Sequence, residues 1–166
     1  MKKLMLANFL IFAFFSCGSD SSTNKIVREG QPNVYVTEGE EMAIAYTNAV
    51  STLHEFENAI KSEDNTLYGF NLKMKFSTSE GNEHIWIRSI YIENDKYFGI
   101  VDNEPIDIKD IHAGDSIQVD NERISDWMYM KDGILHGGYT IKAIRNRMGD
   151  EERRKFDEES EMIIVD

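Results

Sequence analysis

The sequence predicts an α+β domain, in which one long helix near the N-terminus packs on an antiparallel sheet of about five to six strands and the chain ends in helices. Three observations support this prediction. Apolar residues recur at helical spacing over residues 42–61, and from residue 67 the apolar period changes to two. Turn-forming residues then separate the strand-like segments at short intervals, which favours hairpins and hence an antiparallel sheet.

Composition and charge limit the classes of partner. The chain has 166 residues, of which 41% are hydrophobic and 11% aromatic, which suffices for the core of a single domain. The 18 Lys and Arg are outnumbered by 30 Asp and Glu, so the net charge is −12. Because an acidic surface repels phosphate groups, we expect no nucleic-acid partner and no broad electrostatic adhesion to anionic lipid.

Residues 1–16 are typical of a secretory signal peptide. A basic start, Met1-Lys2-Lys3, precedes an apolar run from Leu4 to Phe15, which is shorter than the roughly 20 residues that span a bilayer. The run ends in Ser16-Cys17-Gly18, which contains the only cysteine of the chain and resembles a bacterial lipobox.

The lipobox resemblance implies a lipid anchor. A diacylglyceryl group would be attached to the Cys17 sulfur, the chain would be cleaved before Cys17, and the new amino terminus would be acylated, for example with palmitate. Several acyl chains on one residue hold a protein stably to a membrane. We therefore expect a location in the bacterial cell envelope; the alternative is an ordinary cleaved signal peptide with an unmodified cysteine.

The mature chain is predicted to begin with a tether and to continue as one domain. Residues 17–33 comprise the lipidated cysteine and a flexible polar tether, and residues 34–166 form a single α+β domain. Thr37 and Glu40 have the spacing of a capping box. The helix behind them is expected to reach about Lys61 and to turn its apolar face to the sheet: Met42, Tyr46, Ala49, Val50, Leu53, Ala59 and Ile60.

The strands are expected in order along the rest of the chain. Residues 67–77 alternate as a half-buried strand, and residues 84–92 carry large side chains on both faces, which favours a central strand. Asn94-Asp95 predicts a hairpin turn into a return strand, and Asp132-Gly133 predicts another between residues 124–131 and 134–136. A short strand is expected at residues 116–119.

The C-terminal part is expected to be helical. Ile141, Ile144 and Met148 favour a helix after Gly137-Gly138, although a strand over residues 139–145 is the alternative. A second helix is expected from about residue 149 to 159, because acidic residues at its start complement the helix dipole. Residues 162–165 could add an edge strand.

Several short motifs occur in a characteristic order in this chain: Glu83-His84-Ile85-Trp86-Ile87, Asp102-Asn103-Glu104-Pro105, Ala113-Gly114-Asp115, Ile124-Ser125-Asp126-Trp127-Met128-Tyr129, and Asp132-Gly133 with Gly137-Gly138-Tyr139-Thr140. Together they resemble the bacterial domain of unknown function 2314 family, which includes YegJ-like proteins, over roughly residues 42–157. The resemblance implies domain limits but no activity and no catalytic residue. Where the family usually has Ser-Pro-Glu-Glu after Met148, this chain has Gly149-Asp150-Glu151-Glu152, in which Asp150 can replace Ser as a cap.

Residues 124–148 are the densest in candidate functional side chains. Gly137-Gly138 before a helix could offer N–H groups to an anion, with Arg145 and Arg147 one to two turns further on; alternatively the glycines only permit a sharp corner. Aromatic side chains could form a recognition surface beside them, or could be core. The candidate binding surface is His84, Trp86, Asp126, Trp127, His136, Gly137, Gly138, Tyr139 and Arg145.

An enzyme is the competing prediction. The four histidines lack the short spacings of metal-binding motifs and no nucleophile elbow occurs, so we predict no metal, no cofactor and no assigned catalytic residue. A hydrolase-like acid–base site would require His84 and His136 to meet Asp126, Asp102 or Glu104. We expect instead a non-enzymatic, lipid-anchored envelope domain that binds a protein partner or small ligand; a purely structural envelope lipoprotein is a third class.

Overall fold

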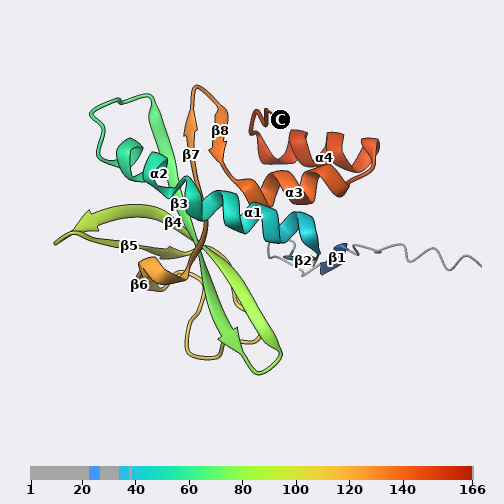
Figure 1. The fold of residues 1–166 in the computed structure, drawn as a ribbon, viewed down its shortest axis with the longest axis horizontal. Helices are drawn as coiled ribbons and strands as arrows, with labels where there is room; N and C mark the ends of the chain where they lie inside the picture. The colour runs from blue at the N-terminus through green and yellow to red at the C-terminus, as the bar shows by residue number, and fades with distance from the viewer. Residues whose placement is uncertain (1–22, 27–33, 38, 166) are drawn as a thin grey trace, which may run out of the picture.

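A six-stranded antiparallel sheet is the centre of the fold, which confirms the predicted α+β class (Figure 1). The computed structural model describes residues 23–26, 34–37 and 39–165. The main sheet has the order β6-β5-β4-β3-β7-β8, and β1 and β2 form a separate pair. The strands are β1 (Thr23–Ile26), β2 (Val34–Thr37), β3 (Leu67–Thr78), β4 (Gly81–Glu93), β5 (Lys96–Val101), β6 (Ser116–Gln118), β7 (Ile124–Lys131) and β8 (Ile134–Gly137). The helices are α1 (Glu40–Ser51), α2 (Leu53–Ile60), α3 (Tyr139–Arg147) and α4 (Asp150–Ser160), with a short 3-10 turn at Asn121–Arg123.

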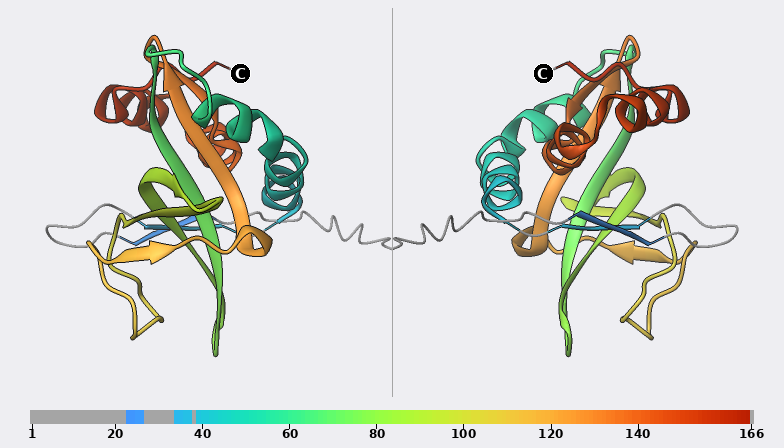
Figure 2. Two further views of the ribbon diagram at one scale, coloured as in Figure 1. Left: turned by 90° about the vertical axis from the view of Figure 1, so that its left-hand side faces the viewer. Right: turned by 90° about the vertical axis from the view of Figure 1, so that its right-hand side faces the viewer.

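The core lies between the sheet and the two N-terminal helices. Leu72 on β3 pairs with Ile87 on β4 and with Trp127 on β7, and none of these side chains is more than 1% exposed. Ala49 and Phe56 from α1 and α2 belong to the same cluster. Figure 2 shows both helices crossing one face of β3 and β7. Each fully buried large apolar side chain contributes about 1.5–3 kcal/mol, so this cluster is the main source of stability.

The predicted strands and hairpin turns are confirmed. The strand over residues 84–92 lies inside β4, which is central because it pairs with β3 on one side and β5 on the other. Asn94 and Asp95 both have positive φ, as do Asp132 and Gly133, which is the geometry of tight two-residue hairpins.

The long helix predicted over residues 42–61 is wrong in one respect, because it is two helices that meet at Thr52. The Thr52 Oγ1 donates to the carbonyl of Asn48 at 2.7 Å and lies 2.9 Å from the Tyr139 hydroxyl. A hydroxyl that bonds to the carbonyl four residues earlier competes with the helical ladder and bends the helix. Val50, which the single-helix pattern placed in the core, is 56% exposed.

The region before α1 also differs from the prediction. Helix α1 begins at Glu40 without a side-chain cap hydrogen bond, and Thr37 is the last residue of β2 and not part of a capping box. Because β2 pairs with β1, four residues of the predicted tether 17–33 form a strand. Cys17 and the predicted signal peptide lie outside the described residues.

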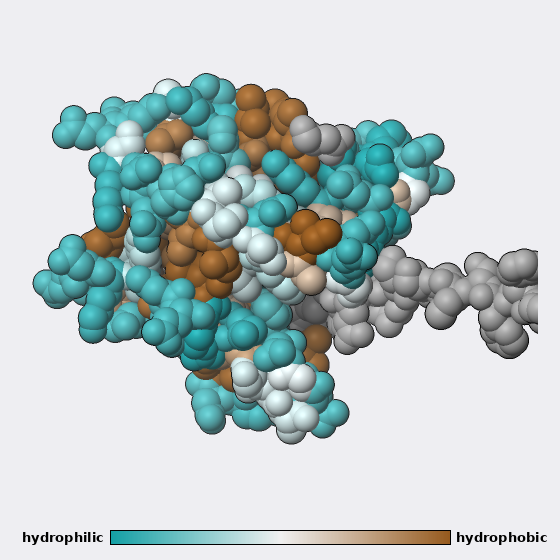
Figure 3. Space-filling model, in the orientation of Figure 1, coloured by the Kyte–Doolittle hydropathy of each residue, from teal (hydrophilic) through white to brown (hydrophobic). Residues whose placement is uncertain are grey.

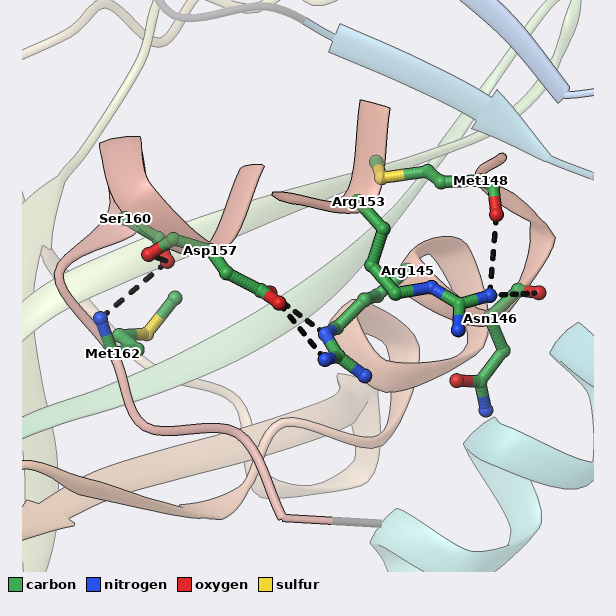
Figure 4. A network of polar contacts seen from close by, with 7 residues as sticks. All are labelled: Arg145, Asn146, Met148, Arg153, Asp157, Ser160 and Met162. Carbon is green, nitrogen blue, oxygen red and sulfur yellow. Dashed lines mark hydrogen bonds and ion pairs between the residues drawn. The ribbon is translucent and has the colours of Figure 1, made fainter. Parts of the chain in front are cut away.

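The predicted helical C-terminus is confirmed, and polar contacts join α3 to α4 (Figure 4). The Arg145 guanidinium donates to both carboxylate oxygens of Asp157, at 2.7 and 2.9 Å. From α4, Arg153 Nη2 donates to the carbonyls of Met148 at 3.2 Å and Asn146 at 3.4 Å. The donor from α4 satisfies carbonyl groups that the end of α3 leaves without helical partners.

The predicted C-terminal edge strand is reduced to one parallel bridge between Ile163 and Ile134. Leu135 N–H donates to the Ile163 carbonyl at 2.9 Å, and Ile163 N–H donates to the Gly133 carbonyl at 2.8 Å. Among the described residues, no helix has both the length and the apolar character needed to cross a membrane.

Candidate functional site

A buried carboxylate at the start of α3 is the centre of the site. Asp126 on β7 is 0% exposed. Its Oδ1 accepts from the N–H groups of Trp127 at 2.8 Å and Tyr139 at 3.2 Å. Its Oδ2 accepts from the Thr140 N–H at 2.8 Å and the Thr140 hydroxyl at 2.6 Å. Because Tyr139 and Thr140 are the first residues of α3, where the helix dipole favours negative charge, Asp126 caps this helix from a neighbouring strand.

A lysine amine contacts the same threonine from β3. Lys73 pairs directly with Asp126, and its Nζ donates to Thr140 Oγ1 at 3.1 Å. The amine also lies 5.2 Å from the centre of the Trp86 ring. Burial lowers the pKa of Lys73, and the negative charge of Asp126 opposes this effect. Burial raises the pKa of Asp126, and the Lys73 charge, followed by the hydrogen bonds from Thr140, opposes that effect. The Thr140 hydroxyl therefore bridges the Lys73 amine and the Asp126 carboxylate, which form no direct ion pair.

A histidine completes the polar cluster on the adjoining part of the sheet. Ser125 Oγ donates to the Lys73 carbonyl at 3.2 Å and lies 2.8 Å from His84 Nδ1. Since the serine proton is used on the carbonyl, the assignment that fits is His84 Nδ1–H donating to Ser125. The imidazole stacks on Tyr46 of α1 at 4.6 Å. Burial, with the charges of Lys73 and Lys75, lowers the pKa of His84 to about 4, so this histidine is neutral near pH 7.

The N–H groups proposed for an external anion already have internal acceptors. Gly138 lies in the left-handed region with φ 61°, and its N–H donates to the Trp127 carbonyl at 2.7 Å. The next two N–H groups donate to Asp126. A Cβ on Gly137, where φ is 69°, would lie 2.3 Å from the Trp127 carbonyl oxygen. Of the two alternatives that the sequence left open, these contacts favour the second: the glycines permit a sharp corner, and Asp126 accepts from the N–H groups that follow it.

For the aromatic residues, which could form a recognition surface or belong to the core, the contacts of Trp127 favour the core. Trp127 is 1% exposed and its Nε1 donates to the Ala49 carbonyl at 2.9 Å, so it is a core residue with a satisfied polar atom. Tyr139 is half-buried and lies edge-on to Trp127, with 5.9 Å between ring centres. Trp86 is half-buried beside Lys73.

The two histidines of the predicted acid–base site do not meet. His136 pairs with Tyr129 and stacks on it at 4.8 Å. His84 pairs with Lys75, two residues from the lysine that pairs with Asp126. Tyr129 and Asp126 are three residues apart on one strand, and directly paired residues share a face, so His136 lies on the opposite face from His84 and Asp126.

The other predicted polar residues are engaged elsewhere. Arg145 binds Asp157 and is not directed at Gly138. Asp102 lies 3.3 Å from Arg88, and Glu104 lies 2.7 Å from the His112 ring. Within the described ranges, no group of three His, Cys, Asp or Glu side chains could hold a metal ion together.

A surface groove lies outside this cluster, between α1 and α3. Its lining combines apolar and polar residues, and the apolar residue Ile44 is 50% exposed. Figure 3 shows a small hydrophobic patch among hydrophilic side chains where α1 and α3 run side by side. The lining residues are Glu41, Ile44, Ala45, Asn48, Tyr139, Lys142, Ala143 and Asn146. An apolar patch surrounded by polar side chains is an arrangement that protein interfaces use.

Sequence reasoning identified His84, Trp86 and Asp126 but missed Lys73, Ser125 and Thr140 as their partners. Lys73 and Thr140 are 67 positions apart, so no local pattern connects them. Lys73 could have been identified only from its place opposite Asp126 on the adjacent strand. That inference requires the strand register, which the sequence does not give. The groove residues are spread over two helices, include the core residue Ala45, and carry no motif.

The comparisons with known proteins place the chain among bacterial proteins. The model of the family described as "Uncharacterized protein conserved in bacteria (DUF2314)" matches residues 39–162. "Putative ankyrin repeat protein NMB1133/NMB1171" of Neisseria meningitidis serogroup B is 41% identical over 75 residues, which are 45% of this chain and 30% of that protein. "Uncharacterized protein YegJ" of Escherichia coli strain K12 is 26% identical over 144 residues, covering 87% of this chain and 88% of that protein. The match thus spans less than a third of the Neisseria protein. No solved structure matches the chain.

Proposed function

We propose a function from the surface of the chain itself, because the chain belongs to the DUF2314 family of uncharacterized bacterial proteins, whose description assigns no activity. The proposal is that it is a lipid-anchored domain of the bacterial cell envelope that binds a protein partner without catalysing a reaction. The groove between α1 and α3 is the observation that supports the binding part of this proposal. The predicted hydrolase-like alternative is not favoured, since its two histidines lie on opposite faces of the sheet.

The groove suits a protein segment that presents an apolar side chain beside a carboxylate. Ile44 offers the exposed apolar contact, and the small side chains of Ala45 and Ala143 allow close approach. The Glu41 charge is taken up by Arg147, whose Nε lies 2.9 Å from it.

Lys142 is the one cationic side chain among the residues that line the groove, and it forms no ion pair with a described residue. A local positive charge in a chain of net charge −12 favours an acidic group on the partner at this point.

The binding proposal is tested by comparing two charge insertions on one helix. Ile44→Glu places a charge in the groove, whereas Val50→Glu, at a residue 56% exposed on the same helix, lies outside the groove lining. We expect one protein to co-purify from solubilised envelope equally with wild type and Val50→Glu and to be depleted at least tenfold with Ile44→Glu. Equal recovery with both variants would refute the groove as the binding site, provided both melt within a few degrees of wild type.

The anchoring proposal has a separate test. It rests on the basic and apolar residues before Cys17 and on the Ser16-Cys17-Gly18 motif. In cells fed an alkyne analogue of palmitate, the wild-type chain should incorporate the alkyne label and the Cys17→Ser chain should not. Equal labelling of both chains, or none of either, would contradict the assignment of Cys17 as the lipid-bearing residue.

A further inference from the structure

We propose that the partner segment bound in the groove between α1 and α3 is an amphipathic α-helix that lies along these two helices. This inference rests on the proposed function, because it names the conformation of the segment that the groove would bind. The bound helix supplies an apolar side chain and a carboxylate from one of its faces.

The residues that line the groove have the same helical spacing on both of its sides. On α1 they occupy positions 41, 44, 45 and 48, and on α3 they occupy positions 139, 142, 143 and 146. Positions i, i+3, i+4 and i+7 share one face of a helix over two turns. The groove therefore follows one face of each helix for about 10 Å, since seven residues rise about 1.5 Å each.

The two helices run in opposite directions along the groove. Glu41, near the start of α1, forms an ion pair with Arg147 at the end of α3. At the other end of the groove, the Thr52 hydroxyl after α1 lies 2.9 Å from the hydroxyl of Tyr139, the first residue of α3. The alanine that each helix contributes to the lining therefore lies midway along the groove, where a small side chain lets a third helix approach closely.

The walls of the groove favour a helical segment over an extended one. All lining residues belong to α1 or α3, and along the middle of the groove their backbone groups bond to one another within each helix. An extended peptide would find no sheet edge here, so its own N–H and C=O groups would depend on water and a few polar side chains. A helix satisfies these groups internally, and an amphipathic helix in an apolar groove is a common mode of recognition.

The side chains at the middle of the groove determine which face the bound helix turns toward it. Ile44 offers an apolar surface that is 50% exposed. Lys142, from the facing turn of α3, forms no ion pair with a described residue. An apolar residue and an Asp or Glu three or four positions apart lie on one face of a helix, so a single face can contact both side chains.

The test measures the rise per residue of the bound segment. A benzophenone amino acid is placed at position 41 or at position 48 of the full chain, at the two ends of the lining on α1, and the crosslinked partner residues are identified by peptide mass spectrometry. A helix advances about 1.5 Å per residue and an extended chain about 3.3 Å, so moving the probe over this distance should shift the crosslinked residue by about seven positions in a helix and about three in an extended segment. A shift of five or more positions is the expected result. A shift of four or fewer would overturn the helix while leaving the groove as the binding site.

A probe outside the groove distinguishes that result from a failure of the proposed function. Position 50 is exposed on α1 and is not part of the lining. No crosslinked species from positions 41 and 48 in the native bacterial cells, or the same species from position 50, would refute binding in the groove and with it the bound helix.

The carboxylate on the bound helix has its own comparison. Lys142→Glu should lower the crosslinking yield from position 48 at least tenfold. Lys61→Glu makes the same change of charge at an exposed lysine at the end of α2, outside the lining, and should keep the yield within about twofold of wild type. An unchanged yield with Lys142→Glu would overturn the assignment of a carboxylate to the bound helix.

Discussion

Replacing Asp126 by Asn tests the polar cluster most sharply, because the two side chains have nearly the same shape. Both carboxylate oxygens of Asp126 face only donors: two N–H groups at Oδ1, and one N–H and one hydroxyl at Oδ2. An amide nitrogen is itself a donor. At the Oδ1 position it would confront two N–H groups, and at the Oδ2 position it would confront the Thr140 N–H while the hydroxyl could reorient.

The expected loss of stability follows from the less costly of these orientations. One buried N–H without an acceptor costs about 1–3 kcal/mol. Loss of the negative charge opposite Lys73 and at the start of α3 adds roughly 1 kcal/mol. We therefore expect Asp126→Asn to lower the free energy of unfolding by about 2–4 kcal/mol, measured by urea denaturation with circular dichroism.

Two comparisons separate this effect from a general loss of a carboxylate. Asp120→Asn alters an exposed cap, whose Oδ1 accepts from the Glu122 N–H at 3.1 Å, and should cost less than about 1 kcal/mol. Asp126→Ala should be more destabilised than Asp126→Asn, and added formate should raise its melting temperature more than that of wild type. A change below 0.5 kcal/mol for Asp126→Asn would refute the assignment of Asp126 as the internal anion.

Three further outcomes follow from the same structure. Folding lowers the pKa of His84 to about 4, so the stability that the neutral ring contributes is fully present above its unfolded pKa near 6.5 and is lost as the pH falls toward 4. Because solvent screens this partly exposed ring, we expect a loss of roughly 1–2 kcal/mol in urea titrations of wild type, and the loss should be absent in His84→Asn. Arg145→Met removes the two-pronged bond to the α4 carboxylate and should speed hydrogen exchange in α4 while leaving the sheet protected. Gly137→Ala would place a Cβ 2.3 Å from the Trp127 carbonyl and should cost more than about 3 kcal/mol, whereas Gly149→Ala, which meets no atom within 4 Å, should melt within a few degrees of wild type.

The strands could be predicted because their information is local. Alternation over residues 67–77 and the turn pair Asp132-Gly133 each determine backbone geometry within a few positions, and β7 has the predicted bounds. The break at Thr52 could not be predicted in this way, because it depends on a hydroxyl that bonds to Asn48 and lies against Tyr139, far along the chain. A continuous amphipathic period on both sides of Thr52 conceals the change of direction.

The sequence indicated several residues of the candidate site but not what each of them does there. The sequence indicates that Asp126, Gly137 and Gly138 are special positions. It does not show that the Asp126 carboxylate accepts from the N–H groups that follow the two glycines. That assignment requires the corner that brings α3 back onto β7. The sequence leaves the place of Trp127 open for a related reason: whether an aromatic residue on a strand faces the core or the solvent depends on which face the helices cover.

The central claim, that the groove between α1 and α3 binds an envelope protein, is tested most directly by photo-crosslinking in cells. A benzophenone amino acid is placed at position 44 in one strain and at position 50 in another, in the chain that retains Cys17. The account predicts one discrete crosslinked species from position 44 and none of that size from position 50, with the species lost when Cys17→Ser removes the anchor. The same species from both positions would contradict the claim that the groove binds an envelope protein. No crosslinked species from position 44 in the native bacterial cells would contradict it as well.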